Sequence, residues 1–358
     1  MSFASRYAVV AWLAMLSSQC LAAKVTTIAV PAGGKPMAAK SDSTGKIHLV
    51  FDSAAGPQYC QLPAGGKSLG KAIPLVDQKS SKPGLEFSVW DLAVGADGSV
   101  HVVLGTNAWK LKLPKEEWGY MYARLPARSN SFDPIRNLNR KPSEGFSIAV
   151  SDKGQVAAIW MADRLFANIS EDNGKTFGQT VALDASLNPC NCCTTSTVYA
   201  AEDRLAILYR EETNNDRDMF LAFWEPSSNK ATKTRVSTTP WKIDSCPMTY
   251  YSMTRTEEGF EIAWPTKGEI FFARLDESGQ LRNPQEIKTS GSNGMRTGLI
   301  VLATPDHQST VVWKKDNRLG WQSYDAKGNA VGLPGLVPSE GNGVAGAVAQ
   351  DGTVVLFR

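Results

Sequence analysis

The sequence has 358 residues, of which 42% are hydrophobic and 20% are charged, and its formal net charge is +3. Lysine and arginine residues are scattered without a basic run or a nucleic-acid-binding module, which argues against nucleic acid as a partner. This length accommodates one large domain or two. Internal repeats therefore have to be considered first.

The N-terminal segment has the features of a signal peptide. Arg6 provides a short positive region, residues 7–16 (YAVVAWLAML) form an apolar run, and small residues suited to cleavage follow. The run is too short to span a bilayer, and no later stretch is as long and apolar as a membrane helix. We therefore expect a signal peptide over residues 1–23 and one soluble mature domain over residues 24–358, periplasmic or secreted. Lipoprotein anchoring through Cys20 is an alternative, although the preceding residues fit the lipidation pattern poorly.

A two-strand unit recurs along the chain about every 50 residues. Each unit has an alternating apolar strand, a tight turn that often carries Asp or Gly, and a second apolar strand. No long stretch shows helical periodicity. The seven units are residues 35–51, 90–104, 146–160, 196–209, 251–264, 298–313 and 344–357.

This repeat predicts an all-β fold, a β-propeller in which each blade has four short antiparallel strands. The last unit ends after two strands, and residues 24–33 read as an isolated outer strand. Pairing of these two terminal pieces would close the ring and leave no open sheet edge. We expect seven blades, with six as the alternative if the terminal pieces complete one another differently.

Residues 170–177 (SEDNGKTF) fit the Asp-box pattern of sialidase-like propellers. Ser170 and Asp172 can accept hydrogen bonds from the turn, Gly174 can supply a positive φ, and Phe177 can pack between sheets. Such a box lies in the hairpin between the third and fourth strands, and we expect a structural role. A calcium loop is the alternative, but the required run of acidic ligands is absent.

Three loops are expected to meet on one face of the propeller. Residues 184–195 and 237–251 connect successive blades, and residues 210–218 join the second and third strands of the fourth blade. All such loops lie on the same face of a propeller. Their convergence is the strongest functional signal in the sequence, and the side chains it brings together are Cys190, Cys192, Cys193, Arg210, Arg217, Asp218, Trp241, Asp244, Cys246, Met248 and Tyr250.

The segments PCNCC, YRE, NDRDMFLA and RVSTTPWKIDSCPMT, within about residues 184–250, resemble a bacterial family of exported sialidase-like (BNR-repeat) proteins. Members often carry a Cys-x-Cys-Cys loop, an Arg-Asp pair and a Trp-Lys-x-Asp-x-Cys-Pro segment in this order. Many are labelled sialidases by similarity. Where relatives often have His after Cys-Pro, this chain has Met248, which disfavours a catalytic imidazole and retains a soft ligand.

The loop cysteines allow three interpretations. A disulfide such as Cys192–Cys246 would tie neighbouring loops together in an oxidising compartment. Alternatively, thiolates and a thioether would bind a soft ion, preferably copper and less well zinc. The third is a redox or nucleophilic cysteine activated by Arg210 or Arg217, for which no catalytic Cys-x-x-Cys and no base is recognised. The set of expected metal ligands is Cys190, Cys192, Cys193, Cys246 and Met248.

The rival functional class is a glycoside hydrolase of the sialidase type at the same face. Sialidases use three arginines around the substrate carboxylate, a tyrosine with a glutamate, and an aspartic acid/base. The first two units contain no arginine before Arg124, and fold alone does not determine activity. The candidates for this chemistry are Arg210, Arg217, Arg296, Asp218, Glu211 and Tyr250 or Tyr251.

We therefore expect an exported binding protein, a monomer whose partner is a small ligand, a metal ion or a glycan. Arg210, Arg217, Asp218, Trp241 and Asp244 are the candidate ligand-binding residues. The Arg217–Asp218 pair can equally connect neighbouring loops, and Trp241 can pack in the core. The three histidines, His48, His101 and His307, are expected to be structural.

Overall fold

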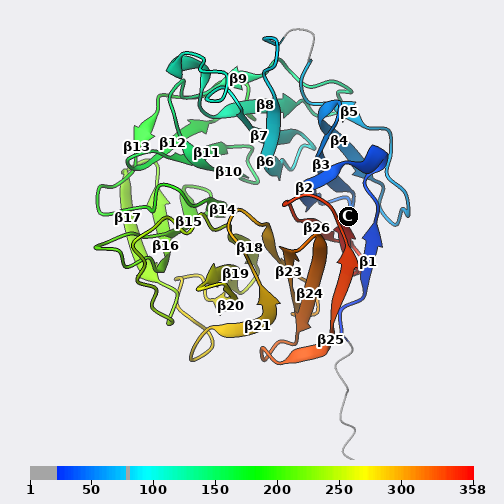
Figure 1. The fold of residues 1–358 in the computed structure, drawn as a ribbon, viewed down its shortest axis with the longest axis vertical. Helices are drawn as coiled ribbons and strands as arrows, with labels where there is room; N and C mark the ends of the chain where they lie inside the picture. Colours follow the sequence, from blue (N-terminus) through cyan, green and yellow to red (C-terminus); the bar gives the residue numbers. More distant parts are fainter. Residues whose placement is uncertain (1–21, 78–80) are drawn as a thin grey trace, which may run out of the picture.

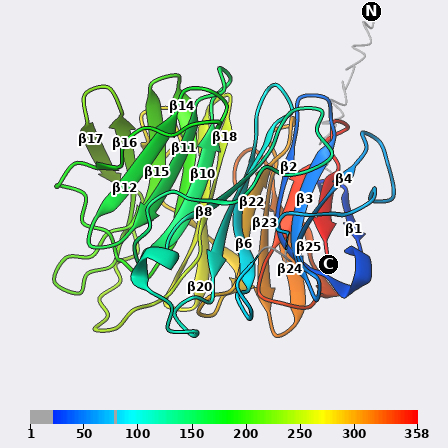
Figure 2. The same cartoon turned by 90° about the horizontal axis from the view of Figure 1, so that it is seen from above.

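The computed structural model describes residues 22–77 and 81–358, so almost all of the expected signal peptide, with Cys20, lies outside the described residues. The described strands form seven sheets arranged around a central axis (Figure 1), and Figure 2 shows the same strands from the side. The fold is therefore a seven-bladed β-propeller, and the six-blade alternative is wrong. Among the described residues, no helix has the length and apolar character needed to cross a membrane.

The first three blades each have four antiparallel strands in sequence order. Blade 1 comprises β2 (Lys35–Ser41), β3 (Ile47–Ser53), β4 (Gly56–Leu62) and β5 (Ile73–Pro74). Blade 2 comprises β6 (Phe87–Val94), β7 (Val100–Thr106), β8 (Met121–Leu125) and β9 (Arg136–Asn137). Blade 3 comprises β10 (Glu144–Val150), β11 (Val156–Met161), β12 (Leu165–Ser170) and β13 (Val181–Ala182).

The next three blades repeat this order. Blade 4 comprises β14 (Thr195–Ala201), β15 (Arg204–Arg210), β16 (Met219–Glu225) and β17 (Lys230–Arg235). Blade 5 comprises β18 (Ser252–Thr256), β19 (Gly259–Thr266), β20 (Glu269–Leu275) and β21 (Ile287–Ser292). Blade 6 comprises β22 (Leu299–Ala303), β23 (Ser309–Lys315), β24 (Arg318–Tyr324) and β25 (Ala330–Pro338). Short 3-10 helices, η1 (Pro31–Gly33) and η3 (Lys115–Glu117), lie in the connections.

Blade 7 is built from both ends of the described chain. β26 (Ala345–Val348) pairs with β27 (Val354–Phe357), and β1 (Val25–Ile28) adds to β27 as a parallel strand. In Figure 1 the blue β1 and the red C-terminal strands lie side by side. This confirms the predicted ring closure.

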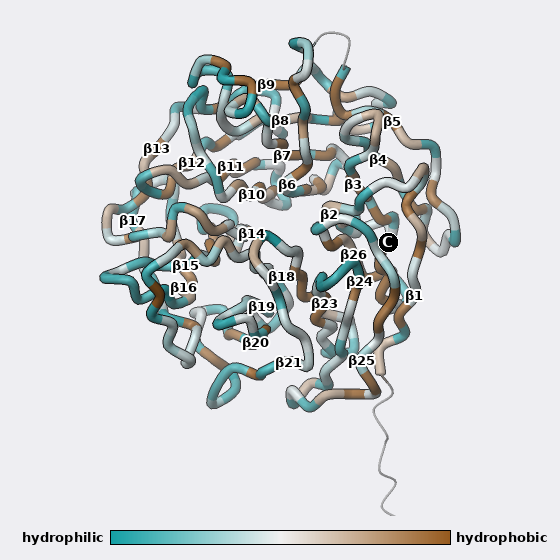
Figure 3. The backbone as a smooth tube through the Cα atoms, in the orientation of Figure 1, coloured by the Kyte–Doolittle hydropathy of each residue, from teal (hydrophilic) through white to brown (hydrophobic). Residues whose placement is uncertain are grey.

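The hydrophobic core is divided into clusters, one at each contact between neighbouring blades. Figure 3 shows apolar stretches along the strands of the blades. Burial of these apolar side chains is the main favourable contribution to packing one blade on the next. The cluster between blades 4 and 5 includes Leu208, Met219 and Trp264, and it also contains Cys190 and Cys193. The cysteine loop is therefore anchored in a core.

Half-buried carboxylates connect neighbouring blades. Asp52 Oδ1 accepts a hydrogen bond of 3.2 Å from the backbone N–H of Val89, joining blades 1 and 2. Asp91 Oδ2 accepts one of 3.1 Å from the N–H of Ile148, joining blades 2 and 3. Burial raises the pKa of Asp52 to about 6 and also raises that of Asp91.

The hairpin at residues 170–177 joins β12 to β13 and is held by local contacts. The Ser170 hydroxyl donates to Asp172 at 2.8 Å and accepts from the Gly174 N–H at 2.9 Å. Gly174 has a φ of +73°, and a Cβ there would lie 1.9 Å from the Tyr122 hydroxyl, so only glycine fits. Phe177 packs edge-on against Tyr122 with ring centroids 5.0 Å apart. These contacts account for a structural role of this hairpin.

Candidate cysteine site and central pocket

The three loops singled out in the sequence contact one another. Residues 184–195 connect β13 to β14, residues 210–218 connect β15 to β16, and residues 237–251 connect β17 to β18. The N–H of Cys190 donates to the Arg210 carbonyl at 2.8 Å, and the N–H of Arg217 donates to the Trp241 carbonyl at 2.7 Å. Backbone hydrogen bonds therefore fix the relative positions of the loops.

A disulfide joins Cys192 to Cys246 and covalently connects the first loop to the third. Both sulfurs belong to the set of metal ligands expected from the sequence. Because a disulfide sulfur is not a thiolate, the expectation of four thiolates at one site does not hold in this state. Met248 has a φ of +46°, and its carbonyl accepts a hydrogen bond of 2.8 Å from the Arg296 N–H.

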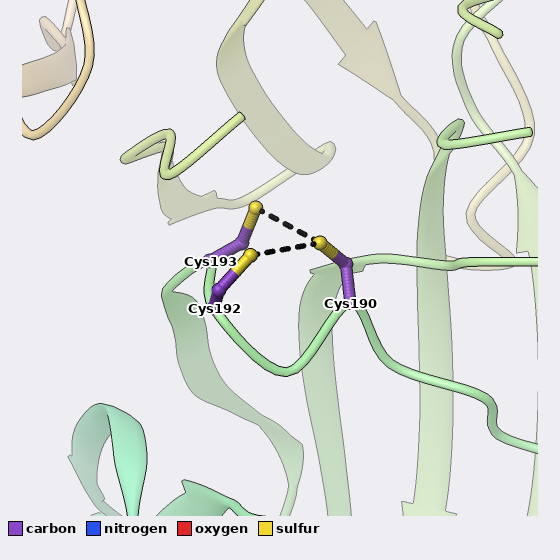
Figure 4. A group of neighbouring side chains, drawn as sticks. All are labelled: Cys190, Cys192 and Cys193. Atoms are coloured by element: carbon purple, nitrogen blue, oxygen red, sulfur yellow. Dashed lines mark hydrogen bonds between the residues drawn. The ribbon is translucent and has the colours of Figure 1, made fainter. Parts of the chain in front are cut away.

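Cys190 and Cys193 are free thiols, and their side chains meet below the loop surface. Their Sγ atoms are 3.4 Å apart, and Sγ of Cys190 is also 3.5 Å from Sγ of Cys192 (Figure 4). Cys190 and Cys193 are only 1% and 2% exposed. The two residues have Cys-x-x-Cys spacing, which sequence reasoning missed because Cys192 lies inside the same four-residue stretch.

Arginine side chains surround this thiol pair. Arg217 Nη1 donates to Cys190 Sγ at 2.9 Å, and the Thr249 hydroxyl lies 3.6 Å from Cys193 Sγ. The hydrogen bond from Cys190 and the charge of Arg210 lower the pKa of the Cys193 thiol to about 6, although burial opposes this. The hydrogen bond with Cys193 raises the pKa of the Cys190 thiol, and burial raises it further. The charge of Arg217 opposes this shift.

Arg210 and Trp241 pack against each other next to the cysteine loop. The Arg210 guanidinium is fully buried, donates to the carbonyls of Arg217 at 2.5 Å and Pro265 at 2.6 Å, and lies 4.7 Å from the centroid of the Trp241 ring. Trp241 is 9% exposed. Both side chains are therefore packed in the interior, where Arg210 is fully buried and Trp241 is almost so.

Two other carboxylates from the prediction have protein partners. Asp218 accepts from the Trp241 N–H at 3.0 Å and forms an ion pair with Arg235 at 3.0 Å. Glu211 forms an ion pair with Lys233 at 2.6 Å and accepts from the Tyr209 hydroxyl. These contacts orient loop 210–218. Asp244 lies exposed at the surface of the third loop.

A central pocket opens beside the cysteine loop and has a volume of about 1450 Å³. It extends from Cys192, Cys193 and Thr194 toward blades 1–3. Aromatic and charged side chains both contribute to its walls. They include Asp52, Glu86, Phe87, Trp90, Trp109, Lys110, Trp118, Glu144, Phe146, Tyr250 and Arg296.

Tyr250, another member of the predicted site, lies in this pocket together with Arg296. Its ring is 6.1 Å from that of Trp90, centroid to centroid. Burial raises its pKa, which the charge of Arg296 partly offsets and that of Glu144 reinforces. Arg296 lines the pocket. Arg210 is fully buried and does not line it, and Arg217 contacts Cys190. The described residues therefore do not assemble the three-arginine cluster considered from the sequence.

The histidines lie away from the cysteines. His48 Nδ1 is 2.7 Å from the Tyr59 hydroxyl in blade 1, and His101 Nδ1 is 2.7 Å from the Tyr122 hydroxyl in blade 2. Both are buried, and burial lowers the pKa of His101 to about 4. His307 is exposed in the turn between β22 and β23.

No protein-family model matches this chain, and no curated protein sequence matches it. Solved structures do. A catalytically inactive virginiamycin B lyase from Staphylococcus aureus is 13% identical, with 89% of each chain covered and a TM-score of 0.52. YCF48 from Cyanidioschyzon merolae is 11% identical, with 89% of this chain and 90% of the other covered and a TM-score of 0.53. A Trypanosoma rangeli sialidase is 11% identical, with 86% of this chain and 56% of the other covered and a TM-score of 0.51. At these identities the similarity establishes the propeller fold alone.

Proposed function

We propose that the protein binds a soft metal ion, Cu(I), between Cys190 and Cys193. The observation that carries this proposal is the meeting of two buried free thiols, 3.4 Å apart, at the edge of a ligand-sized pocket. Thiolates are the ligands that select soft ions such as Cu(I). The third sulfur, that of Cys192, lies 3.5 Å from Cys190.

The number of free thiols favours Cu(I) over zinc. A structural zinc site is closed by four protein ligands, commonly Cys or His. Two of the four loop cysteines are in the Cys192–Cys246 disulfide, and His48 and His101 are buried in other blades. Magnesium and calcium prefer oxygen ligands, which this cluster does not supply.

The neighbouring arginines support an anionic complex. Two thiolates with one Cu(I) carry a net charge of −1, and buried charges need partners. Arg217 contacts Cys190 directly, and Arg210 lies close enough to lower the pKa of Cys193. The protein would therefore stabilise the metal-loaded dithiolate by fixed positive charge.

The central pocket provides the route by which a small ligand, or a ligand carrying the metal, reaches the site. Cys192 and Cys193 line its wall. We also propose that the protein is exported, to the periplasm or beyond. The Cys192–Cys246 disulfide supports this location, since structural disulfides persist in oxidising compartments.

The test is an anaerobic Cu(I) titration against a chromophoric Cu(I) chelator. We expect one Cu(I) per chain for the wild type and loss of this binding in Cys190→Ser and Cys193→Ser. Cys60→Ser is the matched control, because Cys60 is a buried free cysteine of blade 1. Equal copper stoichiometry in the wild type and in Cys190→Ser would overturn the proposal.

A glycoside hydrolase acting in the central pocket is the second candidate. One observation favours it: the same pocket is lined by Tyr250, Glu144, Arg296 and Asp52. Burial raises the pKa of the Asp52 carboxyl to about 6. A carboxylic acid with such a pKa is suited to general acid catalysis near neutral pH. Release of sialic acid from a fluorogenic sialoside, abolished by Asp52→Asn, would support it, and no release by the wild type would exclude sialidase activity.

A further inference from the structure

The sulfur of Cys190 lies next to both the other free thiol and the disulfide of the cysteine site. Cys190 Sγ lies 3.5 Å from Cys192 Sγ, which is part of the disulfide, and 3.4 Å from Cys193 Sγ (Figure 4). Thiol–disulfide exchange requires a thiolate to attack a disulfide sulfur. Cys190 becomes the attacking thiolate when its proton passes to Cys193, whose Sγ lies 3.4 Å away, and Arg217, which donates to Cys190 Sγ at 2.9 Å, stabilises the negative charge left there.

We propose that these four cysteines form a thiol–disulfide exchange centre that reduces a small disulfide compound bound in the central pocket. In the first step Cys190 attacks Cys192 Sγ, and the S–S bond to Cys246 breaks to release the Cys246 thiolate. In the second step Cys193 attacks Cys190 Sγ and releases the Cys192 thiolate. The protons of Cys190 and Cys193 pass to Cys246 and Cys192.

These two steps move a pair of electrons from the buried dithiol to the Cys192–Cys246 pair. Cys190 and Cys193 are 1% and 2% exposed, so compounds from solution have little access to them. Cys192 is half-buried and lines the pocket together with Asn191 and Thr194. Cys192 is therefore the sulfur through which the buried pair can react with a pocket ligand.

The reaction with a disulfide compound RSSR then balances. The Cys192 thiolate attacks one sulfur of RSSR, forms a mixed disulfide and releases RS⁻. Cys246 attacks Cys192 Sγ, releases the second RS⁻ and restores the Cys192–Cys246 disulfide. Overall, RSSR and the dithiol of Cys190 and Cys193 give two RSH and a Cys190–Cys193 disulfide. A dithiol compound would reverse this reaction.

The experiment uses metal-free wild-type protein in chelator, with oxidised glutathione as the probe, so that its outcome is independent of copper binding. After an acid quench, thiols are alkylated and disulfides are mapped by peptide mass spectrometry. We expect release of reduced glutathione and appearance of Cys190–Cys193 with Cys192–Cys246 retained. Cys193→Ser should stop at a Cys190–Cys192 disulfide with Cys246 free and alkylated.

The decisive comparison is with the double variant Cys192→Ser/Cys246→Ser. If electrons pass through Cys192, this variant should form Cys190–Cys193 at least about ten-fold more slowly than wild type, whereas an equal rate would overturn the proposal. Cys190→Ser should release no glutathione, and release at the wild-type rate would equally refute the mechanism. Cys60→Ser should behave as wild type, and circular dichroism verifies that each variant is folded.

Discussion

Arg217 donates a hydrogen bond through Nη1 to Sγ of Cys190, at 2.9 Å. The same side chain donates through Nε to the carbonyl of Ile243 at 3.3 Å. Arg217 therefore connects the sulfur cluster to the loop that carries Cys246. Both contacts of its guanidinium are therefore with the cysteine site and its neighbouring loop.

The first prediction concerns the charge of the thiol pair. Ultraviolet absorbance of thiolate should show one group titrating below the usual range of a thiol, because the hydrogen bond from Cys190 and the charge of Arg210 lower the pKa of Cys193. The second thiol should keep its proton, since the first negative charge and burial oppose another. Cys193→Ser should lose the low-pH titration and Cys60→Ser should retain it. A wild type without a thiolate below pH 8 would contradict the arrangement of arginines described above, given that an unperturbed thiol titrates near pH 8.5.

The second prediction concerns the disulfide. Cys192 and Cys246 are separated by 54 residues, so the cross-link restricts a long loop of the unfolded chain. The double variant Cys192→Ser/Cys246→Ser should lose about 2–4 kcal/mol of unfolding free energy, measured by urea denaturation. Reductant should destabilise the wild type and leave this variant unaffected. Equal stability of the two proteins would show that the loops are held by their other contacts alone.

The third prediction concerns Asp52. Its pKa in the folded state is about 6, above the value of 3.8 for the free group. Its contribution to stability is therefore fully present below pH 4 and is lost as the pH rises through about 6. Asp52→Asn, which keeps an oxygen for the Val89 N–H, should gain roughly 1–3 kcal/mol relative to wild type between pH 4 and pH 7. A constant difference over this range, measured by urea midpoints, would refute the burial of a charged group there.

The fourth prediction concerns His101. Burial, helped by Arg124, lowers its pKa to about 4 from 6.5. The neutral imidazole therefore contributes stability that is present above pH 6.5 and is lost as the pH falls toward 4. His101→Asn should flatten the loss of stability between these pH values. The exposed His307 serves as the control, and His307→Asn should leave the slope unchanged.

The blade repeat was predictable because the first two strands of each blade are the most regular. In β10 and β11, for example, apolar residues such as Ile148 and Ile159 are buried on the blade surfaces, and a short turn lies between the strands. The outermost strands were not predictable in the same way. β5 and β13 have only two residues each, none of them buried, so they leave no apolar pattern.

The candidate site was predictable only in part. Loop order in a propeller places Cys190 and Cys246 on one face, and the observed disulfide Cys192–Cys246 is the pairing named in the sequence analysis. That Cys190 and Cys193 remain free thiols in contact depends on distances that spacing does not contain. Arg210 and Trp241 were candidate ligand-binding residues in the sequence analysis. A sequence does not distinguish a side chain that packs in the interior from one that contacts a ligand. Trp90 and Glu144 were missed because they lie at the inner strands of blades 2 and 3, far along the chain from the cysteine loop.

The parallel pairing of β1 with β27 also has a consequence for folding. The register joins Val25 to Val354, so blade 7 forms only when two segments far apart in the sequence come together. Before that pairing, blades 1–6 form an open arc. Apolar side chains of blade 1 such as Phe51 and Ala39 then lack the packing partners that blade 7 supplies. An arc with such an open end exposes apolar surface, and exposed apolar surface in a partly folded chain promotes aggregation until the last blade closes.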